Sequence, residues 1–163
     1  MSKIIVIGCP GSGKSTFSRE LSKKTGTPLF YLDMLFWNKD KTTVEKSVFL
    51  DRLSTVLEKD EWIIDGNYAS TMEMRLSACD TVFFLDYPLE ICLEGIRERV
   101  GKPRPDMPWI ESEEDSEFVE FIKSFNERQR PSILELLEKY KNKKIVIFRS
   151  REEAGEFLNG EKL

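Results

Sequence analysis

The stretch Lys3-Ile4-Ile5-Val6-Ile7-Gly8-Cys9-Pro10-Gly11-Ser12-Gly13-Lys14-Ser15 decides the fold class of this chain. Its first five residues form a continuous apolar run rich in β-branched side chains, which predicts a buried strand. Residues 8–15 fit the pattern G-x-x-x-x-G-K-[ST], in which glycines let main-chain N–H groups approach a phosphate closely. A helix is expected from Ser15 to Lys24, and its N-terminal end favours an anion at the same place. We therefore predict a nucleotide triphosphate site, built from a strand, a loop and a helix.

The positions of this loop suit the parts of a bound ATP molecule. Lys14 supplies a mobile cation for the β- and γ-phosphates, and the hydroxyl of Ser15 is a ligand for Mg²⁺. The alternative is a glycine-rich turn between strand and helix that binds no ligand. ATP is expected to contact the following residues of the loop and the first helical turn: Gly8, Gly11, Ser12, Gly13, Lys14, Ser15 and Thr16.

Four further apolar runs predict strands that alternate with helices. The strands are expected at Leu29–Leu32, Trp62–Ile64, Thr81–Leu85 and Lys144–Phe148. Helices are expected after a capping box at Thr42 and Glu45, at 69–78, from Pro88 to Val100, in a longer region that Pro131 should kink or split, and at 152–158. This alternation predicts an α/β fold, with a five-stranded parallel sheet and helices on both faces. Because no linker or repeat interrupts the chain, residues 1–163 are expected to form a single domain.

The composition narrows the class of protein. The chain has 25 basic and 29 acidic residues, for a net charge of −4, so we expect no direct binding to duplex DNA. It has no histidine and three cysteines without metal spacing, which argues against zinc and against histidine acid–base catalysis. The apolar runs are too short to span a bilayer or to form a signal peptide, so a cytoplasmic protein with no membrane contact is expected, as a monomer or homodimer.

The absence of two GTPase motifs from the sequence narrows the class of protein further. A GTPase would carry N-K-x-D, but the nearest string, Asn38-Lys39-Asp40-Lys41, has its aspartate one place early, and no D-x-x-G switch occurs. A small lone phosphate-binding domain that is rich in arginine late in the chain favours a small-molecule kinase.

Two carboxylates follow predicted strands and should meet at the same edge of the sheet, because the carboxyl ends of parallel strands lie together. Asp65 ends the third strand and is the best candidate to hold Mg²⁺ through water; the alternative is a turn residue. Asp33 ends the second strand and could orient the acceptor hydroxyl or phosphate or accept its proton; the alternative is a helix cap or turn.

Three segments are candidates for the acceptor pocket. The string Leu35-Phe36-Trp37 could wall the pocket, with Phe36 and Trp37 stacking on a base, or could equally anchor a loop on the core. Gly66 and Asn67 follow Asp65 and are expected to contact the acceptor. Arg75 is predicted to bind an acceptor phosphate.

Arginines cluster between residues 97 and 130. Arg97, Arg104, Arg128 and Arg130 are predicted to lie on a lid that closes on the transferring phosphoryl group and expels water. The alternative is ordinary ion pairing with Glu94, Glu98 or Glu127.

The chain resembles the adenylate-kinase-like P-loop proteins called DNA topology modulation (FlaR-like) proteins over nearly its whole length. The resemblance rests on residues 8–15, on Leu32-Asp33-x-Leu35-Phe36-Trp37, and on Trp62-Ile63-Ile64-Asp65-Gly66-Asn67-Tyr68. It continues in Phe84-Leu85-Asp86-Tyr87-Pro88, Gly101-Lys102-Pro103-Arg104-Pro105-Asp106-Met107, Phe125-Asn126, Arg130-Pro131 and Ser150-Arg151. It implies a fold of the nucleoside monophosphate kinase type, ATP at residues 8–15, and a lid near Arg97 to Arg104.

Residues and resemblance together predict an ATP- and Mg²⁺-dependent phosphotransferase. Lys14 would hold the phosphates, Ser15 and Asp65 would place Mg²⁺, Asp33 would place the acceptor, and the lid arginines would stabilise the transferring group. The acceptor class expected first is a nucleotide or nucleoside. The alternative is a nucleotide-binding regulatory protein that modulates DNA topology without small-molecule kinase activity.

Overall fold

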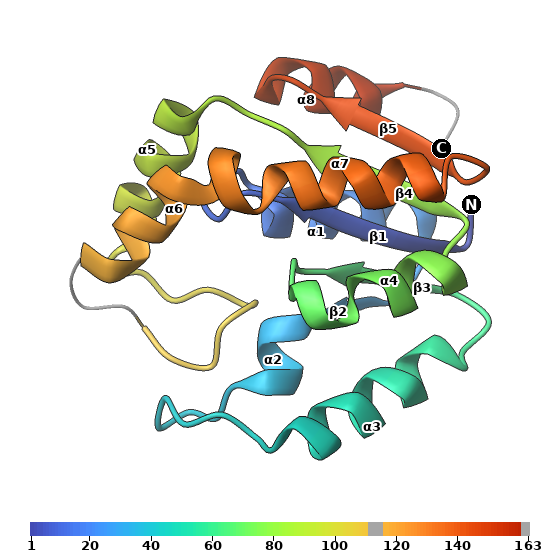
Figure 1. Ribbon diagram of the computed structural model, residues 1–163, viewed down its shortest axis with the longest axis horizontal. Coiled ribbons are helices and arrows are strands. Elements are labelled where there is room, and N and C mark those ends of the chain that lie inside the picture. Colours follow the sequence, from blue (N-terminus) through green and yellow to red (C-terminus); the bar gives the residue numbers. More distant parts are fainter. Residues whose placement is uncertain (111–115, 161–163) are drawn as a thin grey trace.

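A computed structural model describes residues 1–110 and 116–160 of the chain (Figure 1). Strands and helices alternate through most of it. Their bounds, in chain order, are β1 (Lys3–Gly8), α1 (Lys14–Thr25), β2 (Leu29–Tyr31), α2 (Leu32–Phe36), α3 (Lys46–Leu57), β3 (Trp62–Asp65), α4 (Ala69–Ala78), β4 (Thr81–Leu85), α5 (Leu89–Arg99), α6 (Ser116–Arg128), α7 (Arg130–Lys139), β5 (Lys144–Phe148) and α8 (Arg151–Asn159).

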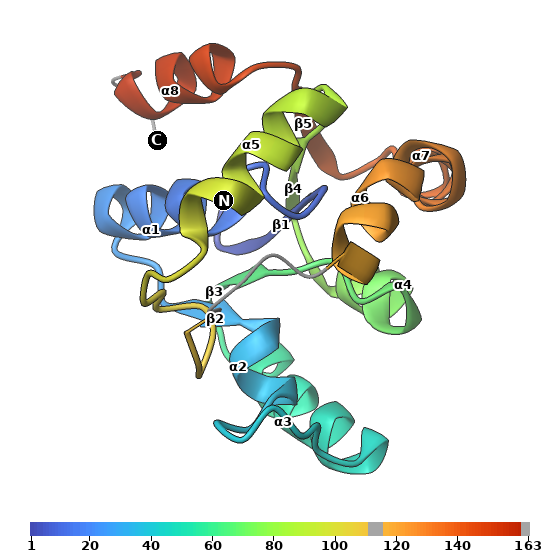
Figure 2. The ribbon, with the colours of Figure 1, turned by 90° about the vertical axis from the view of Figure 1, so that its left-hand side faces the viewer.

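The strands form one sheet at the centre of the molecule. Its order is β2-β3-β1-β4-β5, and every neighbouring pair is parallel. Helices α1 and α8 cover one face and α4 and α7 the other, while α2 and α3 lie beyond the β2 edge (Figure 2). The predicted α/β fold, with a parallel sheet between two helical layers, is confirmed. None of the described helices is long and apolar enough to cross a membrane.

The central strands are buried because helices cover both of their faces. Residues 4–7, 63–64 and 82–84 have no exposed surface. Between the sheet and α1 and α8, Phe17 packs against Phe83 with ring centroids 5.2 Å apart, and Phe83 stacks on Phe148 at 6.0 Å. Burying a phenylalanine contributes about 2 kcal/mol, so this cluster fixes α1, and with it the loop before α1, on the sheet.

The second strand is shorter than predicted. It ends at Tyr31, and Leu32–Phe36 form the helix α2, so Asp33 lies in a first helical turn and not at the end of a strand. Leu32 is fully buried, and Phe36, four residues later on the same face, packs against Phe49 of α3. This contact with α3 is remote in sequence, and it draws the segment into a helix.

The capping box predicted at Thr42 is also wrong. The main-chain N–H and hydroxyl of Thr42 both donate to the carboxylate of Asp40, which closes a turn, and α3 begins only at Lys46. In contrast, Pro131 splits the longer helical region as predicted, because it falls in the first turn of α7, directly after α6 ends.

Candidate functional site

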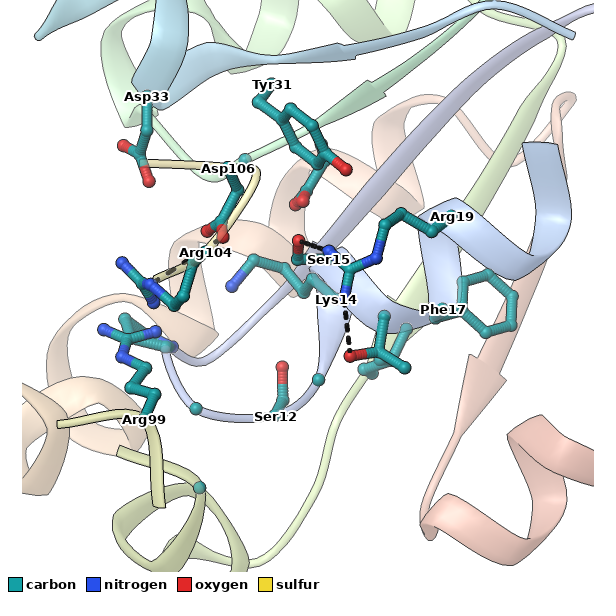
Figure 3. A pocket seen from close by; sticks show the side chains of 18 of the residues that line it. Ser12, Lys14, Ser15, Phe17, Arg19, Tyr31, Asp33, Arg99, Arg104 and Asp106 are labelled. Atoms are coloured by element: carbon teal, nitrogen blue, oxygen red, sulfur yellow. Dashed lines mark hydrogen bonds and ion pairs between the residues drawn. The ribbon is translucent and has the colours of Figure 1, made fainter. Parts of the chain in front are cut away.

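A pocket of about 840 Å³ lies at the carboxyl ends of the strands. Residues 10–16 form its floor, and side chains of α2, of the connection from β3 to α4, of the connection from α5 to α6, and of α8 form its walls (Figure 3). Residues 111–115 of the predicted lid lie outside the described residues. The site therefore falls where a parallel α/β sheet places its ligands.

Glycines allow the loop between β1 and α1 to touch α5. A Cβ on Gly11 would lie 2.0 Å from the carbonyl oxygen of Cys92, and one on Gly95 would lie 2.1 Å from the carbonyl oxygen of Gly11. Gly13 has a φ of 95°, a left-handed conformation that favours glycine. The loop and the helix thus meet backbone to backbone, which fixes the loop conformation.

Asn67 clamps the start of the loop. Its Oδ1 accepts a hydrogen bond from the N–H of Gly8 at 3.1 Å, and its Nδ2 donates to the carbonyl oxygen of Gly8 at 2.7 Å. Asn67 was predicted to contact the acceptor, and it does line the pocket. However, both polar atoms of its side chain are engaged by the loop, so its role in this structure is to position the loop.

The polar groups of the loop fit a phosphate. The hydroxyl of Ser12 is buried and makes no hydrogen bond to any described residue, so it is a donor aimed into the loop. Lys14 lines the same space, with its Nζ 3.5 Å from the carbonyl oxygen of Cys9. A phosphate oxygen would satisfy the Ser12 hydroxyl and offer Lys14 an opposite charge, as expected of an anion-binding loop at a helix N-terminus.

Arg19 stands one turn along α1 from the loop. It donates to Ser15 Oγ at 2.7 Å and to Thr16 Oγ1 at 3.3 Å, as the dashed lines in Figure 3 show. Sequence reasoning did not select this residue. Its spacing of four from Ser15 on one helix was the available signal, because residues four apart share a helical face.

Asp65 is buried beside this loop. Burial raises the pKa of its carboxyl to about 7, against the opposing effect of Lys14, and the nearby charges of Asp106 and Asp33 raise it further. The described residues contain no cluster of three or more acidic, cysteine or histidine side chains able to hold a metal ion. Mg²⁺ commonly binds to one or two protein oxygens together with nucleotide phosphates and water, and Ser15 and Asp65 provide such oxygens beside the loop. Ser15 and Asp65 are the residues that would hold it.

Asp33 lies on the opposite side of the pocket. Burial raises the pKa of its carboxyl, even though the Tyr68 hydroxyl donates to its Oδ1 and Lys14 is near. The charge of Asp106, on the connection from α5 to α6, contributes to the same rise. Asp33 therefore combines a fixed orientation with a carboxyl whose pKa is moved toward neutrality, as a group that accepts a proton requires.

The two aromatic residues predicted to wall the acceptor pocket have different positions. Phe36 packs edge-on against Phe49 and Tyr68 and does not line the pocket, so it anchors α2. Trp37 does line the pocket, and its ring lies 5.0 Å from that of Trp109, on the connection from α5 to α6. Phe36 therefore anchors α2 on the core, and Trp37 forms part of the pocket wall.

Arg75 is not positioned to bind an acceptor phosphate. Its side chain has no exposed surface and does not line the pocket. Its guanidinium donates to the carbonyl oxygens of Gly66, Asn67 and Tyr68, and Nε donates to Thr71 Oγ1. Arg75 therefore holds the connection from β3 to α4, of which Gly66 lines the pocket.

Of the four arginines predicted for the lid, Arg104 lines the pocket, where it lies 3.7 Å from Asp106. Arg97 and Arg128 are exposed and do not line it. Arg130 binds Asp86 through two nitrogens, so it fastens α7 to the end of β4. This ion pair has a different partner from the glutamates considered in the sequence.

Two other arginines line the pocket and were not selected from the sequence. Arg99 ends α5, directly before the connection that carries Arg104. Arg151 begins α8, immediately beyond the end of β5. The rule that ligands bind at strand ends, applied to the fifth strand as well as to the others, would have selected Arg151.

Comparison with known proteins places this loop and sheet in a family. The model of a family described as AAA domain matches residues 4–120, which include the loop, Asp33, Asp65 and the connection from α5 to α6. The chain belongs to this AAA domain family. Its fold is that of P-loop kinases, and the resemblance to DNA topology modulation proteins stays a prediction.

Curated relatives match part of the chain. An adenylate kinase of Thermotoga neapolitana is 30% identical over 91 residues, which cover 54% of this chain and 40% of that protein. The uncharacterized protein YqaC of Bacillus subtilis is 31% identical over 100 residues, which cover 59% of this chain and 55% of that protein. The match thus spans about half or less of the relatives' length.

Solved structures match nearly the whole chain. The shikimate kinase of Acinetobacter baumannii in complex with shikimate superposes with a TM-score of 0.64 at 17% identity, covering 98% of this chain and 92% of that one. A shikimate kinase of Bacteroides thetaiotaomicron gives 0.61 at 20% identity, covering 96% and 93%. A gluconokinase of Sinorhizobium meliloti gives 0.60 at 14%, covering 97% and 87%. These likenesses show the fold alone.

Proposed function

We propose that the protein is an ATP- and Mg²⁺-dependent small-molecule kinase. One observation carries the proposal: the phosphate-binding loop, with the unsatisfied Ser12 hydroxyl and Lys14, opens into the same pocket as the half-buried carboxyl of Asp33, whose pKa is raised. A site for the phosphate donor and a group able to receive a proton from an acceptor thus face one pocket. A protein that only bound nucleotide would need no second carboxyl of raised pKa opposite its phosphate loop.

The loop would hold the phosphates of ATP. Main-chain N–H groups of Gly11 and of Gly13 to Thr16, and the Ser12 hydroxyl, would donate to them, while Lys14 would neutralise charge on the β- and γ-phosphates. Ser15 and Asp65 would hold Mg²⁺, which when bound supplies positive charge to the phosphate oxygens. Arg19 would have to release the Ser15 hydroxyl, and it could then contact phosphate itself.

Asp33 would orient the acceptor. Its Oδ1 is fixed by Tyr68, so Oδ2 is the atom that would accept a proton from an attacking hydroxyl. Phosphoryl transfer depends more on positioning and charge than on a strong base, so the main contribution of Asp33 is to align the acceptor with the γ-phosphate.

The connection from α5 to α6 would act as the lid. Arg104 would keep the role that the sequence assigned to it, and Arg99 would take the part assigned to Arg97, Arg128 and Arg130, because Arg99 and Arg104 line the pocket. They would stabilise negative charge on the transferring group, and the Trp37–Trp109 contact would hold the lid against α2 while water is excluded.

The test is ADP production from Mg-ATP in the presence of nucleoside monophosphates, nucleosides and small alcohols. ADP that depends on an acceptor, and that falls at least about a hundredfold in Lys14→Ala, is the expected result. Lys24→Ala, an exposed lysine in the last turn of α1, is the matched control and should keep full activity.

ADP formed at one slow rate whatever the acceptor would overturn the kinase proposal. The regulatory alternative, in which nucleotide binding modulates DNA topology, would then be tested by fluorescence anisotropy with duplex DNA at 50 mM salt, with and without ATP.

A further inference from the structure

Most basic side chains that line the pocket come from the loop and the helices around it, which also contribute Glu20 of α1 and Glu98 of α5. We call the loop of residues 10–16 and its surroundings the phosphate half, and Asp33, Trp37, Tyr68 and Asp106 the acceptor half. In Figure 3, Asp33 and Asp106 lie toward Tyr31, whereas Lys14, Arg99 and Arg104 lie toward the loop. The lining basic residues of the described chain come from α1, α5, the connection from α5 to α6, and α8: Lys14, Arg19, Arg99, Lys102, Arg104 and Arg151.

The acceptor half is acidic. Among the described lining residues, β2, α2 and the connection from β3 to α4 contribute one carboxylate, Asp33, and no lysine or arginine, while Asp106 is added by the connection from α5 to α6. The charge of Asp106 raises the pKa of both Asp33 and Asp65, whereas the charge of Lys14 lowers both. Arg104 approaches this half, and Asp106 lies 3.7 Å from it. With Lys14 committed to the phosphates of ATP and Asp65 to Mg²⁺, the carboxylates of Asp33 and Asp106 would still face the guanidinium of Arg104.

The residue best placed in sequence to compensate is withdrawn from the pocket. Arg75 follows the connection from β3 to α4, yet its guanidinium is buried beneath that connection and bonded to three carbonyl oxygens. Turning it outward would break its hydrogen bonds to three half-buried carbonyls and to Thr71, a loss that an acceptor phosphate in partial contact with water would not offset. The acceptor half therefore keeps its negative charge.

We propose that the acceptor is an uncharged or cationic hydroxyl compound, and that the acceptor half rejects molecules carrying a phosphate or carboxylate at that end. The proposal rests on the kinase function proposed above. The hydroxyl would donate to Asp33, an amino group or further hydroxyls would meet Asp106, and Trp37 with Tyr68 would pack on the apolar part of the molecule. Of the two acceptor classes expected from the sequence, nucleotides and nucleosides, this proposal favours the nucleosides, which carry no phosphate.

The test uses matched pairs that differ by one phosphate: adenosine and AMP, cytidine and CMP, glucosamine and glucosamine 6-phosphate. Shikimate and gluconate serve as carboxylate probes. The ratio of kcat/KM within each pair is measured from ADP production. Binding is measured separately by the fluorescence of Trp37 and Trp109, with the loop filled by a non-hydrolysable ATP analogue and Mg²⁺, so that AMP cannot occupy the ATP site.

For each pair that the enzyme phosphorylates, kcat/KM should be about a hundredfold higher for the unphosphorylated member. This is the order of magnitude expected when a dianion is placed near two carboxylates. Asp106→Asn should reduce this preference about tenfold, because it removes one repelling charge. Asp51→Asn, on the exposed side of α3, is the matched control and should leave the ratio unchanged. Thermal unfolding checks that each variant is folded.

The outcomes separate the two proposals. Turnover of phosphorylated or carboxylated acceptors at rates equal to or above those of the neutral members would overturn this inference and leave the kinase function standing. A preference unchanged in Asp106→Asn would also overturn it. ADP production at the same rate with every acceptor would refute the kinase function. If, in addition, the protein bound the phosphorylated and carboxylated probes but not the neutral ones, the proposed preference for neutral or cationic acceptors would also be refuted. If none of the neutral probes binds, that too counts against the inference.

Discussion

Replacing Arg75 by methionine would show whether this arginine holds the fold or binds substrate. The side chain is fully buried, and its guanidinium donates to main-chain carbonyls of Gly66 at 3.0 Å, of Tyr68 at 3.1 Å and of Asn67, and to the Thr71 hydroxyl at 3.1 Å. Burial lowers the pKa of Arg75 to about 9, which still leaves it a cation at neutral pH. Methionine keeps the apolar stem but provides no donor.

The expected loss of stability follows from these contacts. Hydrogen bonds to a charged group contribute about 1.5–3 kcal/mol each, but the carbonyls of a surface connection regain some water when the arginine is lost. We therefore expect Arg75→Met to lower the free energy of unfolding by about 3–5 kcal/mol. For a chain of this length that corresponds to a fall in Tm of about 10–15 °C.

The assay is urea denaturation and thermal unfolding of the nucleotide-free protein. Arg52→Met is the matched control, because Arg52 is an exposed arginine with one hydrogen bond to a main-chain carbonyl, that of Leu35 at 2.9 Å. It should cost less than about 1 kcal/mol. A variant at Arg75 that unfolds like the unmodified protein but shows a raised KM for a phosphorylated acceptor would refute this reasoning and restore the phosphate-ligand hypothesis.

Three further predictions concern the loop and its neighbours. Asp65→Asn should stabilise the nucleotide-free protein by about 4 kcal/mol at pH 8. In the folded protein the pKa of the Asp65 carboxyl is raised from 3.8 to about 7, so the unmodified protein has its full stability below pH 4 and loses about that amount as the pH rises to 7. Urea denaturation at pH 5 and pH 8 checks it, and a gain independent of pH would contradict it. Gly95→Ala should weaken ATP binding at least tenfold by calorimetry, since its Cβ would lie 2.1 Å from the carbonyl oxygen of Gly11; unchanged affinity would mean that the loop can shift freely. Cys9 should react slowly with iodoacetamide at pH 8 compared with a free thiol, because its hydrogen bond with Cys92 and its burial raise its pKa; rapid labelling would contradict the burial.

The sequence predicted best those elements whose own residues, without contacts from distant segments, favour one conformation. The strand at 144–148 and the helix at 69–78 have the predicted bounds because their apolar patterns are strong. The loop before α1 was recognised because glycines at positions 8, 11 and 13 adopt backbone conformations or make close contacts that other residues do not allow. Pro131 split its helical region for a reason equally local.

What the sequence could not show depends on contacts between distant segments. Helix α2 replaced the end of a predicted strand because Phe36 packs on α3 and Tyr68, and neither contact is visible from five residues. Arg75 and Arg104 differ in a way that the local sequence does not show. Arg75 is buried beneath the connection from β3 to α4, whereas Arg104 lines the pocket because the chain between α5 and α6 passes over it.

The two halves of the pocket are joined mechanically by two residues first assigned to acceptor binding. Arg75 holds the carbonyl oxygen of Asn67, and the side chain of Asn67 holds both main-chain polar groups of Gly8. The connection that borders the acceptor half and the loop that binds phosphate are therefore parts of one hydrogen-bonded unit. A displacement of that connection would move Gly8, and phosphate in the loop would hold Asn67 in place. Binding at the two halves should consequently be coupled, since each ligand fixes a unit that the other also requires.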